Sequence, residues 1–321
     1  MFFALTPDQQ EFGSAVTTYL AERFDLAAVR EVFESDGDGS PESLWKAAGE
    51  QGWLAVTVPE EHDGLGLGLV EAQVIARALG AGVAPGPWRG TVLAAEAIRL
   101  AGSPEQRAAW LPRLATGAAV GAYTLGGPVE YGGLADVVVT PEGLRTGFEA
   151  TPVGSYDRTT RLSRVEGGTV EPLPGDASTV EARATVLVAA DLVGIAREAL
   201  TRTVAYDRER EQFGVPVGSF QALKHALADL HVGVTMAEHA ALYAAHAVDV
   251  GLEDAALAVS VAKAKASDTA LQATAAMIQY HGGIGYTWEH EAHLFYKRAK
   301  RLAGSFGTAD VHRERIAALT L

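Results

Sequence analysis

The chain of 321 residues contains no cysteine. This absence excludes disulfides, thiol nucleophiles and cysteine-ligated metal sites, and it suits a reducing compartment. Basic residues are also scarce, because 26 Lys and Arg stand against 40 Asp and Glu and give a formal net charge of −14. Binding of nucleic acid needs a basic surface that neutralises phosphates, so nucleic acid is not expected as a partner.

Long hydrophobic runs are missing as well. The best apolar stretch, residues 184–195, carries Asp191 and is too short to span a bilayer. Residues 1–12 have no basic segment ahead of their short apolar run, so a secretory signal is not expected. His290 and His293 have no third ligand at metal spacing, which argues against a zinc site. We therefore expect a cytoplasmic protein that binds no membrane and no metal.

The residues that are present predict a helical N-terminal part. Hydrophobic residues make up 48% of the chain and charged residues 21%, which is ordinary for a globular protein with a substantial core. Three candidate helix starts place a hydroxyl residue before a proline, namely Thr6-Pro7, Ser40-Pro41 and Ser103-Pro104, and Gln9 and Gln106 complete two capping boxes. These signals predict a helical domain over residues 1–117.

The pattern changes twice after this domain. Short β-branched runs separated by Gly, Pro and Asp, such as residues 137–139 and 169–170, predict a small β domain over residues 118–178. Apolar stripes at helical spacing then predict three antiparallel helices of about 25 to 30 residues, joined at residues 214–219 and 251–254. Shorter helices after Thr287 would complete a bundle over residues 179–321.

Two strings stand out in the bundle: "YDREREQFGVPVGSFQ" over residues 206–221 and "QYHGGIGYTWEH" over residues 279–290. From its position in the chain alone, each string has an ordinary structural interpretation. Arg210 would end a long helix that Gly214 caps in the left-handed conformation, and Phe213 would be a core residue. Gly282 and Gly283 would simply stop a helix.

Together, these strings and the order of a helical, a β and a helical domain resemble the acyl-CoA dehydrogenases, over the whole chain and most strongly from Asp191 onward. The resemblance implies a mainly α fold with a small central β domain, FAD as cofactor and an acyl-CoA as substrate. It places Arg210 against the FAD pyrophosphate and Phe213 beside the flavin. It also implies that Gln279, Gly282 and Gly283 contact the same cofactor, and that all five residues reach across a subunit interface to the FAD of a neighbouring subunit.

The chain departs from this family at the catalytic base. Most members carry the Glu of an E-G-T tripeptide where this chain has Phe306, and a phenyl ring cannot take a proton. One branch places the Glu near the start of the first long bundle helix, which corresponds to residues 184–185, with Glu181 about one turn earlier. The β domain is short, and residues 123–133, "YTLGGPVEYGG", lack the usual flavin-covering sequence.

These departures resemble the α2β2 acyl-CoA dehydrogenases of actinobacterial sterol side-chain degradation, in which one subunit supplies the base and flavin cover and the other supplies distal FAD contacts. The resulting hypothesis is a non-catalytic subunit that completes the FAD site of a partner carrying the catalytic Glu. Two alternatives stay open: a homo-oligomeric enzyme that uses Glu289 or Glu181 as a displaced base, and a flavin-free scaffold.

Two further features have competing interpretations. Thr287 is a good N-cap, which would put Glu289 and Glu291 in the first turn of the next helix, where carboxylates are stabilised by the helix dipole. The basic residues at positions 297, 298, 300 and 301 are typical of a solvated helix face, or they contact a nucleotide phosphate.

Overall fold

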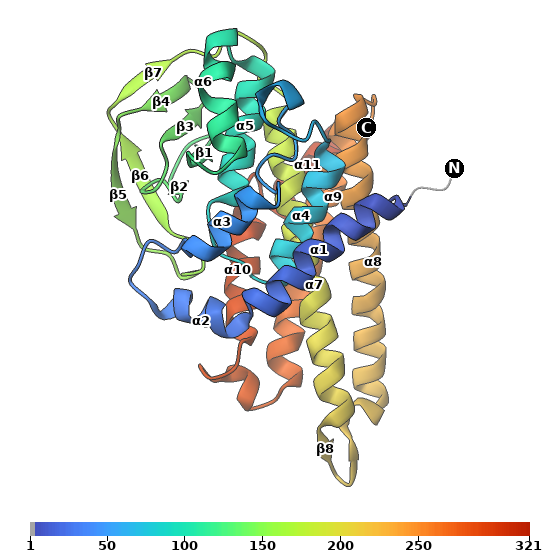
Figure 1. The fold of residues 1–321 in the computed structure, drawn as a ribbon. Helices are drawn as coiled ribbons and strands as arrows, with labels where there is room; N and C mark the ends of the chain where they lie inside the picture. The colour runs from blue at the N-terminus through green and yellow to red at the C-terminus, as the bar shows by residue number, and fades with distance from the viewer. Residues whose placement is uncertain (1–3) are drawn as a thin grey trace. The chain divides into compact units, whose positions relative to one another are not determined.

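The computed structural model describes residues 4–321 (Figure 1). Residues 1–3, the start of the segment in which no secretory signal is expected, lie outside the described residues. The chain is mainly helical with two small sheets and a hairpin, which confirms the predicted fold class. No helix in the described part of the chain is both long enough and apolar enough to span a membrane.

The helices and strands follow the predicted order. The first six helices are α1 (Pro7–Arg23), α2 (Leu26–Glu34), α3 (Glu42–Glu50), α4 (Leu69–Ala81), α5 (Trp88–Ala101) and α6 (Pro104–Ala115). Seven strands come next: β1 (Gly121–Tyr123), β2 (Val129–Glu130), β3 (Val137–Thr140), β4 (Gly143–Thr146), β5 (Glu149–Val153), β6 (Leu162–Glu166) and β7 (Thr169–Glu171). The remaining elements are α7 (Val180–Glu209), β8 (Glu211–Gln212), β9 (Val215–Pro216), α8 (Gln221–Val250), α9 (Ala255–Tyr280), α10 (Ala292–Gly304) and α11 (Ala309–Thr320), and short 3₁₀ turns lie at Glu60–His62, Val217–Ser219 and Ile284–Tyr286.

Two of the three predicted helix starts are correct. Thr6 and Ser103 both form full capping boxes with the glutamine three residues later. The prediction for Ser40 is wrong, because α3 begins at Glu42 after an extended Pro41 and has no side-chain cap. The Ser40 N–H instead donates to the Asp38 carboxylate at 2.9 Å, so this serine belongs to the preceding turn.

The chain forms two compact units, one comprising the chain up to Leu26, Gln73–Ala84 and Thr185–Leu321, and the other Ala27–Ala72 and Pro85–Ala184. In the second unit, α5 packs against β1 of a four-stranded sheet with the order β1-β3-β4-β7. Strands β1 and β3 are parallel, and the other pairs of that sheet are antiparallel. A three-stranded antiparallel sheet has the order β2-β6-β5. The division into domains at residues 117 and 178 remains a prediction.

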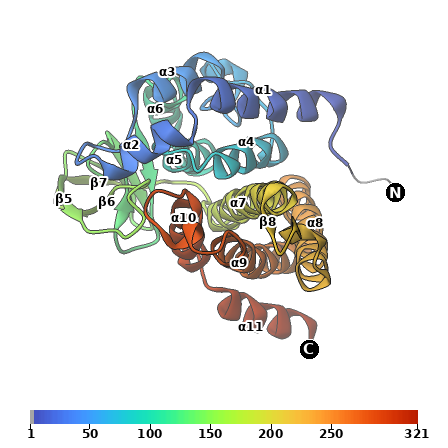
Figure 2. The ribbon, with the colours of Figure 1, turned by 90° about the horizontal axis from the view of Figure 1, so that it is seen from below.

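The first unit contains the helical bundle. Helices α7 and α8 have 30 residues each and α9 has 26, as predicted, and α8, α10 and α11 all pack against α9 (Figure 2). Helices α4 and α7 approach closely at Gly80 and Gly194. A Cβ atom at Gly194 would lie 2.0 Å from the Arg77 carbonyl oxygen, so only glycine fits there.

Candidate functional site

The first motif forms the end of α7 and an unpredicted hairpin. Helix α7 ends at Glu209, and the Arg210 N–H donates to the Tyr206 carbonyl at 2.8 Å. The side chain of Arg210 is exposed and has no partner among residues 4–321. Arg210 is therefore at the helix end, as predicted, with its guanidinium free to bind an anion.

Phe213 and Gly214 form the turn of the β8–β9 hairpin, with φ values of 56° and 80°. Two consecutive positive φ values are the geometry of tight hairpin turns. The predicted role of Gly214 as the helix C-cap is therefore wrong, because the chain continues into a strand before this glycine. The interpretation of Phe213 as a core residue is also wrong, since its side chain is 93% exposed; its ring meets that of Phe220 edge-on, at a centroid distance of 6.2 Å.

The second motif ends α9. Gln279 lies exposed in the last turn, and its carbonyl oxygen accepts the Gly282 N–H at 3.1 Å. Gly282 has a φ of +63°, which favours glycine, and a Cβ atom at Gly282 or Gly283 would meet nothing within 4 Å. The glycine pair thus stops the helix and also presents bare backbone at the surface, so both interpretations of it are compatible.

Side chains join the two motifs at one end of the bundle, where Figure 1 shows the β8 hairpin at the lower tip. The Tyr206 hydroxyl donates to the His281 carbonyl at 3.3 Å, and the two rings stack with centroids 4.3 Å apart. Arg202 of α7 forms an ion pair of 3.0 Å with Glu291, just before α10. Burial lowers the pKa of His281, whereas its hydrogen bond to the Met277 carbonyl acts in the opposite direction. Burial has the larger effect, so this ring favours the neutral form. The contact of Tyr206 with His281 therefore joins the part of α7 that leads to Arg210 to the end of α9 that leads to Gly282.

A buried carboxylate, Asp207, lies within the first motif and was missed by the sequence analysis. Its side chain is 1% exposed, and neither carboxylate oxygen has a hydrogen-bond partner within residues 4–321. Burial raises its pKa to about 6. The available signal was helical spacing, because Ala199, Thr203 and Asp207 recur every four residues on the buried side of α7.

The loop at the expected base position is well fixed but holds no acid. Phe306 connects α10 to α11 with a left-handed φ of +53°, and His312 Nε2 lies 3.0 Å from its carbonyl oxygen. The buried Lys263 ammonium donates to the carbonyls of Ala303 and Gly307, at 3.1 and 2.8 Å. Burial lowers the pKa of Lys263 to about 8. Hydrogen bonds thus hold the backbone of this loop in place, but the Phe306 side chain cannot accept a proton.

The two alternative carboxylates lie in different units. Glu181 is in the first turn of α7, in the second unit, and Glu289 is an exposed residue of the turn before α10, in the first unit. The prediction that Thr287 caps a helix containing Glu289 is wrong, because α10 begins only at Ala292 with Glu291 at the N-cap position. The Thr287 hydroxyl instead donates to the Ile284 carbonyl at 2.9 Å and closes the 3₁₀ turn.

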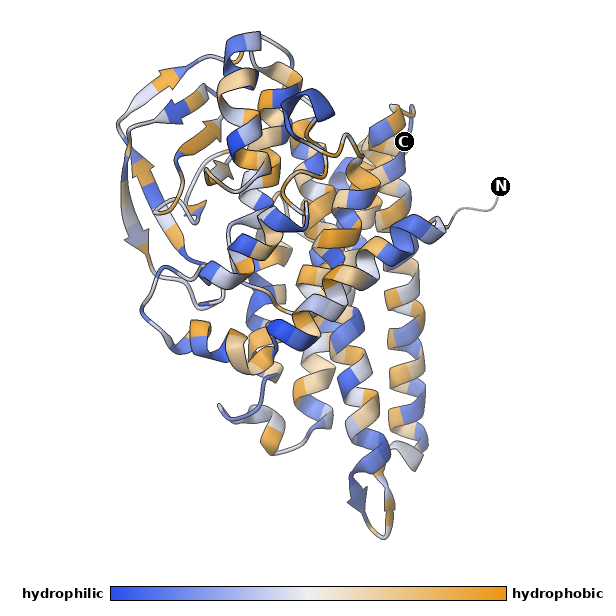
Figure 3. Ribbon diagram, viewed as in Figure 1, coloured by the Kyte–Doolittle hydropathy of each residue, from blue (hydrophilic) through white to orange (hydrophobic). Residues whose placement is uncertain are grey.

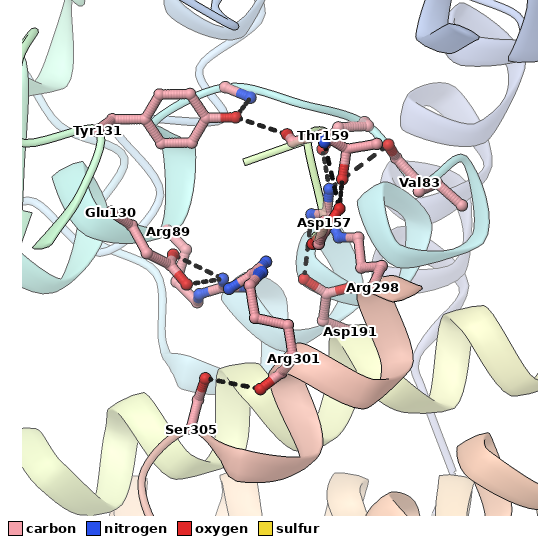
Figure 4. A network of polar contacts seen from close by, with 12 residues as sticks. Val83, Arg89, Glu130, Tyr131, Asp157, Thr159, Asp191, Arg298, Arg301 and Ser305 are labelled. Carbon is pink, nitrogen blue, oxygen red and sulfur yellow. Dashed lines mark hydrogen bonds and ion pairs between the residues drawn. The ribbon is translucent and has the colours of Figure 1, made fainter. Parts of the chain in front are cut away.

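The basic cluster is not a uniformly solvated face. Arg298 is buried, donates to the Ala84 carbonyl at 2.9 Å and lies 3.4 Å from the Asp191 carboxylate (Figure 4). The Lys297 ammonium lies 4.0 Å from the centre of the Trp288 ring. The interpretation as a solvated helix face is therefore wrong for Arg298, which satisfies backbone carbonyls inside the first unit.

The second unit has its own polar contacts around residues 123–133. The Tyr131 hydroxyl accepts the Gly86 N–H at 2.6 Å and donates to the Thr159 carbonyl at 2.8 Å, and Arg89 pairs with Glu130 at 2.7 Å (Figure 4). A cavity of about 630 Å³ in the same unit is lined by Tyr131, Leu134, Val153, Arg158 and Leu162, among others. None of the predicted cofactor-binding residues belongs to its lining.

Comparison with known proteins adds independent information. The model of the acyl-CoA dehydrogenase N-terminal domain matches residues 6–118, and that of the acyl-CoA dehydrogenase C-terminal domain matches residues 181–321. The chain is 40% identical over 306 residues to the acyl-CoA dehydrogenase IpdE2 of Mycobacterium tuberculosis, covering 92% of each protein. It is 36% identical over 320 residues to IpdE2 of Mycolicibacterium smegmatis, covering 98% of this chain and 99% of that protein.

Solved structures show the same fold. A chain of the ChsE4-ChsE5 complex from Mycobacterium tuberculosis superposes with a TM-score of 0.89 at 25% identity, covering 99% of this chain and 98% of that one. A chain of the Tcur3481-Tcur3483 steroid acyl-CoA dehydrogenase superposes with a TM-score of 0.88 at 26% identity, covering 97% of both. With both domain models and a 40% identical relative over nearly its full length, this chain belongs to the acyl-CoA dehydrogenase family.

Proposed function

We propose that this chain is the non-catalytic subunit of a heteromeric FAD-dependent acyl-CoA dehydrogenase and that it completes the FAD site of its partner. The observation that carries the proposal is a surface of motif residues at one end of the bundle that the chain itself leaves unused. Arg210 has no partner among the described residues, and Phe213 is 93% exposed on its hairpin. The Tyr206–His281 contact connects both to the exposed backbone at Gly282 and Gly283.

This surface fits the distal part of a dinucleotide. A guanidinium is a planar set of donors that matches phosphate oxygens and stays charged at any working pH. Bare glycine backbone lets such a ligand approach closely, and no hydrogen bond within residues 4–321 involves the Gly283 N–H. A large aromatic residue at positive φ in full solvent is unfavourable for an isolated chain. Coverage by a ligand and a second subunit would account for it.

The proposed roles of the two subunits follow from the catalytic carboxylate that this chain lacks. FAD supplies the hydride acceptor for the β-hydrogen of an acyl-CoA, while the α-proton must pass to a carboxylate. Phe306 cannot take that proton, and its loop is held by Lys263 and His312. The catalytic Glu therefore belongs to the partner, and Arg210, Phe213, Gln279, Gly282 and Gly283 of this chain position the cofactor. Similarity to a steroid acyl-CoA dehydrogenase supports a bulky acyl group, with a steroid side chain as the leading candidate.

Flavin content tests this assignment. Expressed alone, the chain should contain well under one FAD per subunit and show no dye reduction dependent on acyl-CoA. Co-expressed with a longer acyl-CoA dehydrogenase chain that carries the Glu, it should give a complex with one FAD per heterodimer. Stoichiometric flavin on the lone chain would support the homo-oligomeric alternative with Glu289 or Glu181 as base, and a colourless complex would support the scaffold alternative.

A further inference from the structure

The cavity of the second unit is separate from the residues proposed to bind FAD. It measures about 630 Å³ and is lined by the loop that joins α2 to α3 and by the connection from β5 to β6. Pockets for small molecules typically measure about 300 to 1,000 Å³. All of its lining residues belong to the second unit, whereas Arg210, Phe213, Gln279, Gly282 and Gly283 belong to the first.

Hydrogen bonds within the second unit fix the wall of this cavity. The Arg161 guanidinium donates to the carbonyl oxygens of Gly37 at 2.8 Å and Ser35 at 2.9 Å, so it fastens the α2–α3 loop to the start of β6. Tyr131, whose hydroxyl has two backbone partners, is 3% exposed and forms another part of the wall. A fixed wall lowers the ordering cost of binding a ligand.

One buried hydroxyl group in the cavity has no partner. Ser163 lies on β6, along which Figure 3 shows hydrophobic and hydrophilic residues mixed. Its side chain is 5% exposed and makes no hydrogen bond within residues 4–321. Gly133 leaves the space beside it open, since even a Cβ atom there would lie 3.5 Å from Ser163 Oγ. A buried hydroxyl without a partner is unfavourable, so a ligand oxygen would satisfy this group.

Arg158 supplies a second donor to the cavity. Its Nη2 atom donates to the Asp36 carboxylate at 2.7 Å, whereas its Nε and Nη1 atoms make no hydrogen bond in the described part of the chain. A guanidinium group can only donate, and the Ser163 hydroxyl can donate as well. The two groups therefore match a ligand that carries acceptor oxygens.

The charges around the cavity balance. Asp36 and Asp38 stand against Arg158 and Arg161, and each arginine is engaged by a carboxylate or by carbonyl oxygens. A polyanion such as FAD or a CoA thioester would meet two exposed carboxylates there, with no net positive charge to offset its phosphates. The lining therefore favours an uncharged ligand.

We propose that this cavity is a second ligand site, which binds an uncharged and mainly apolar molecule that carries ketone oxygens. Ser163 and Arg158 donate hydrogen bonds to these oxygens, and Leu134, Val153 and Leu162 contact the apolar body. A ketone accepts hydrogen bonds without bringing a charge, so it suits two donors in a lining without net charge. The site does not depend on the proposed flavin role.

Equilibrium dialysis of androstenedione, a rigid apolar ring system with a ketone at each end, tests the site. The full chain should bind one molecule per copy, and its complex with the partner subunit should keep this site. Ser163→Ala and Arg158→Gln should each weaken binding by about 5-fold to 10-fold, as expected for loss of one hydrogen bond. Arg164→Gln, at an exposed arginine of β6 outside the lining, is the matched control and should leave the affinity unchanged.

Competition tests the preference for an uncharged ligand. Androsterone sulfate should compete more weakly than androstenedione by about 10-fold or more, because its negative charge meets the exposed carboxylates. Absence of saturable binding would overturn the proposal, as would binding that Ser163→Ala leaves unchanged or that FAD or octanoyl-CoA displaces. FAD content per heterodimer should stay the same in Ser163→Ala. Loss of FAD from this variant would instead assign the cavity to the flavin site and so contradict a separate ligand site.

Discussion

The Tyr206 hydroxyl donates a hydrogen bond to the His281 carbonyl at 3.3 Å, and the two rings stack with centroids 4.3 Å apart. Tyr206 stands four residues before Arg210, and His281 stands next to Gly282. This contact therefore joins the turn of α7 that precedes Arg210 to the residue that precedes Gly282. This pair of rings connects two strings that are about 60 residues apart in the chain, because it joins α7 to the end of α9.

Replacement of Tyr206 should loosen this surface in two stages. Tyr206→Phe keeps the stack and loses one hydrogen bond, so FAD affinity of the assembled complex should fall by less than about 10-fold, in line with about 1 kcal/mol per bond. Tyr206→Ala removes both contacts and should weaken FAD binding clearly more. Fluorescence titration of flavin into the apo-complex measures both. Equal affinities for the two variants would show that the ring stack does not position the site.

Arg210→Ala should release FAD from the assembled complex while the bundle stays folded. A charge-assisted contact with the pyrophosphate contributes about 2 to 4 kcal/mol, so the dissociation constant should rise by about 30-fold to 1,000-fold. Arg208→Ala, at an exposed arginine two residues earlier, is the matched control and should leave it unchanged. An unchanged dissociation constant for Arg210→Ala would leave this residue only a role at the helix end.

Glu289→Gln and Glu181→Gln should each leave turnover of the FAD-saturated complex within a few-fold. Neither group is proposed to reach the substrate α-carbon, and an amide keeps the shape of the side chain. Loss of a true base would instead reduce the rate by about 100-fold to 10,000-fold. A reduction of that size in steady-state turnover, for either variant, would make this chain an active dehydrogenase in its own right.

Asp207 should make the stability of the chain depend on pH. Burial raises its folded-state pKa to about 6, above its ordinary value of 3.8, so the folded state holds the proton more tightly than the unfolded state. The free energy of unfolding should therefore decrease as the pH rises from about 4 to about 6, and the full penalty persists above that range. Urea unfolding of the chain across this range measures the effect.

Asp207→Asn should remove this dependence. At pH 7 the variant should be more stable than the wild type by about 1 to 3 kcal/mol, because the buried negative charge is gone. The difference should shrink as the pH approaches 4, where the wild-type carboxyl is protonated as well. Asp229→Asn, at an exposed aspartate of α8, controls for the loss of one charge. A constant difference between pH 4 and pH 8 would contradict the assignment to Asp207.

The sequence by itself determined the helical elements, their order and the two motifs. Apolar spacing identified α7, α8 and α9 to within a few residues, because a periodic stripe over 26 to 30 residues leaves little ambiguity. The capping boxes at Thr6 and Ser103 depend only on residues within one turn, so they are readable from the chain. The exchange of a carboxylate for Phe306 was likewise visible without coordinates.

Only the tertiary structure decided how these parts are used. The β8–β9 hairpin and the exposure of Phe213 were not predicted, because two-residue strands leave almost no periodic signal. The burial of Asp207, whose carboxylate has no hydrogen-bond partner within residues 4–321, and the burial of Arg298 depend on residues distant in sequence. The exposure of Val232 and Met236 on α8 could not be predicted for the same reason: periodicity finds an apolar residue, but packing determines whether the chain itself covers it.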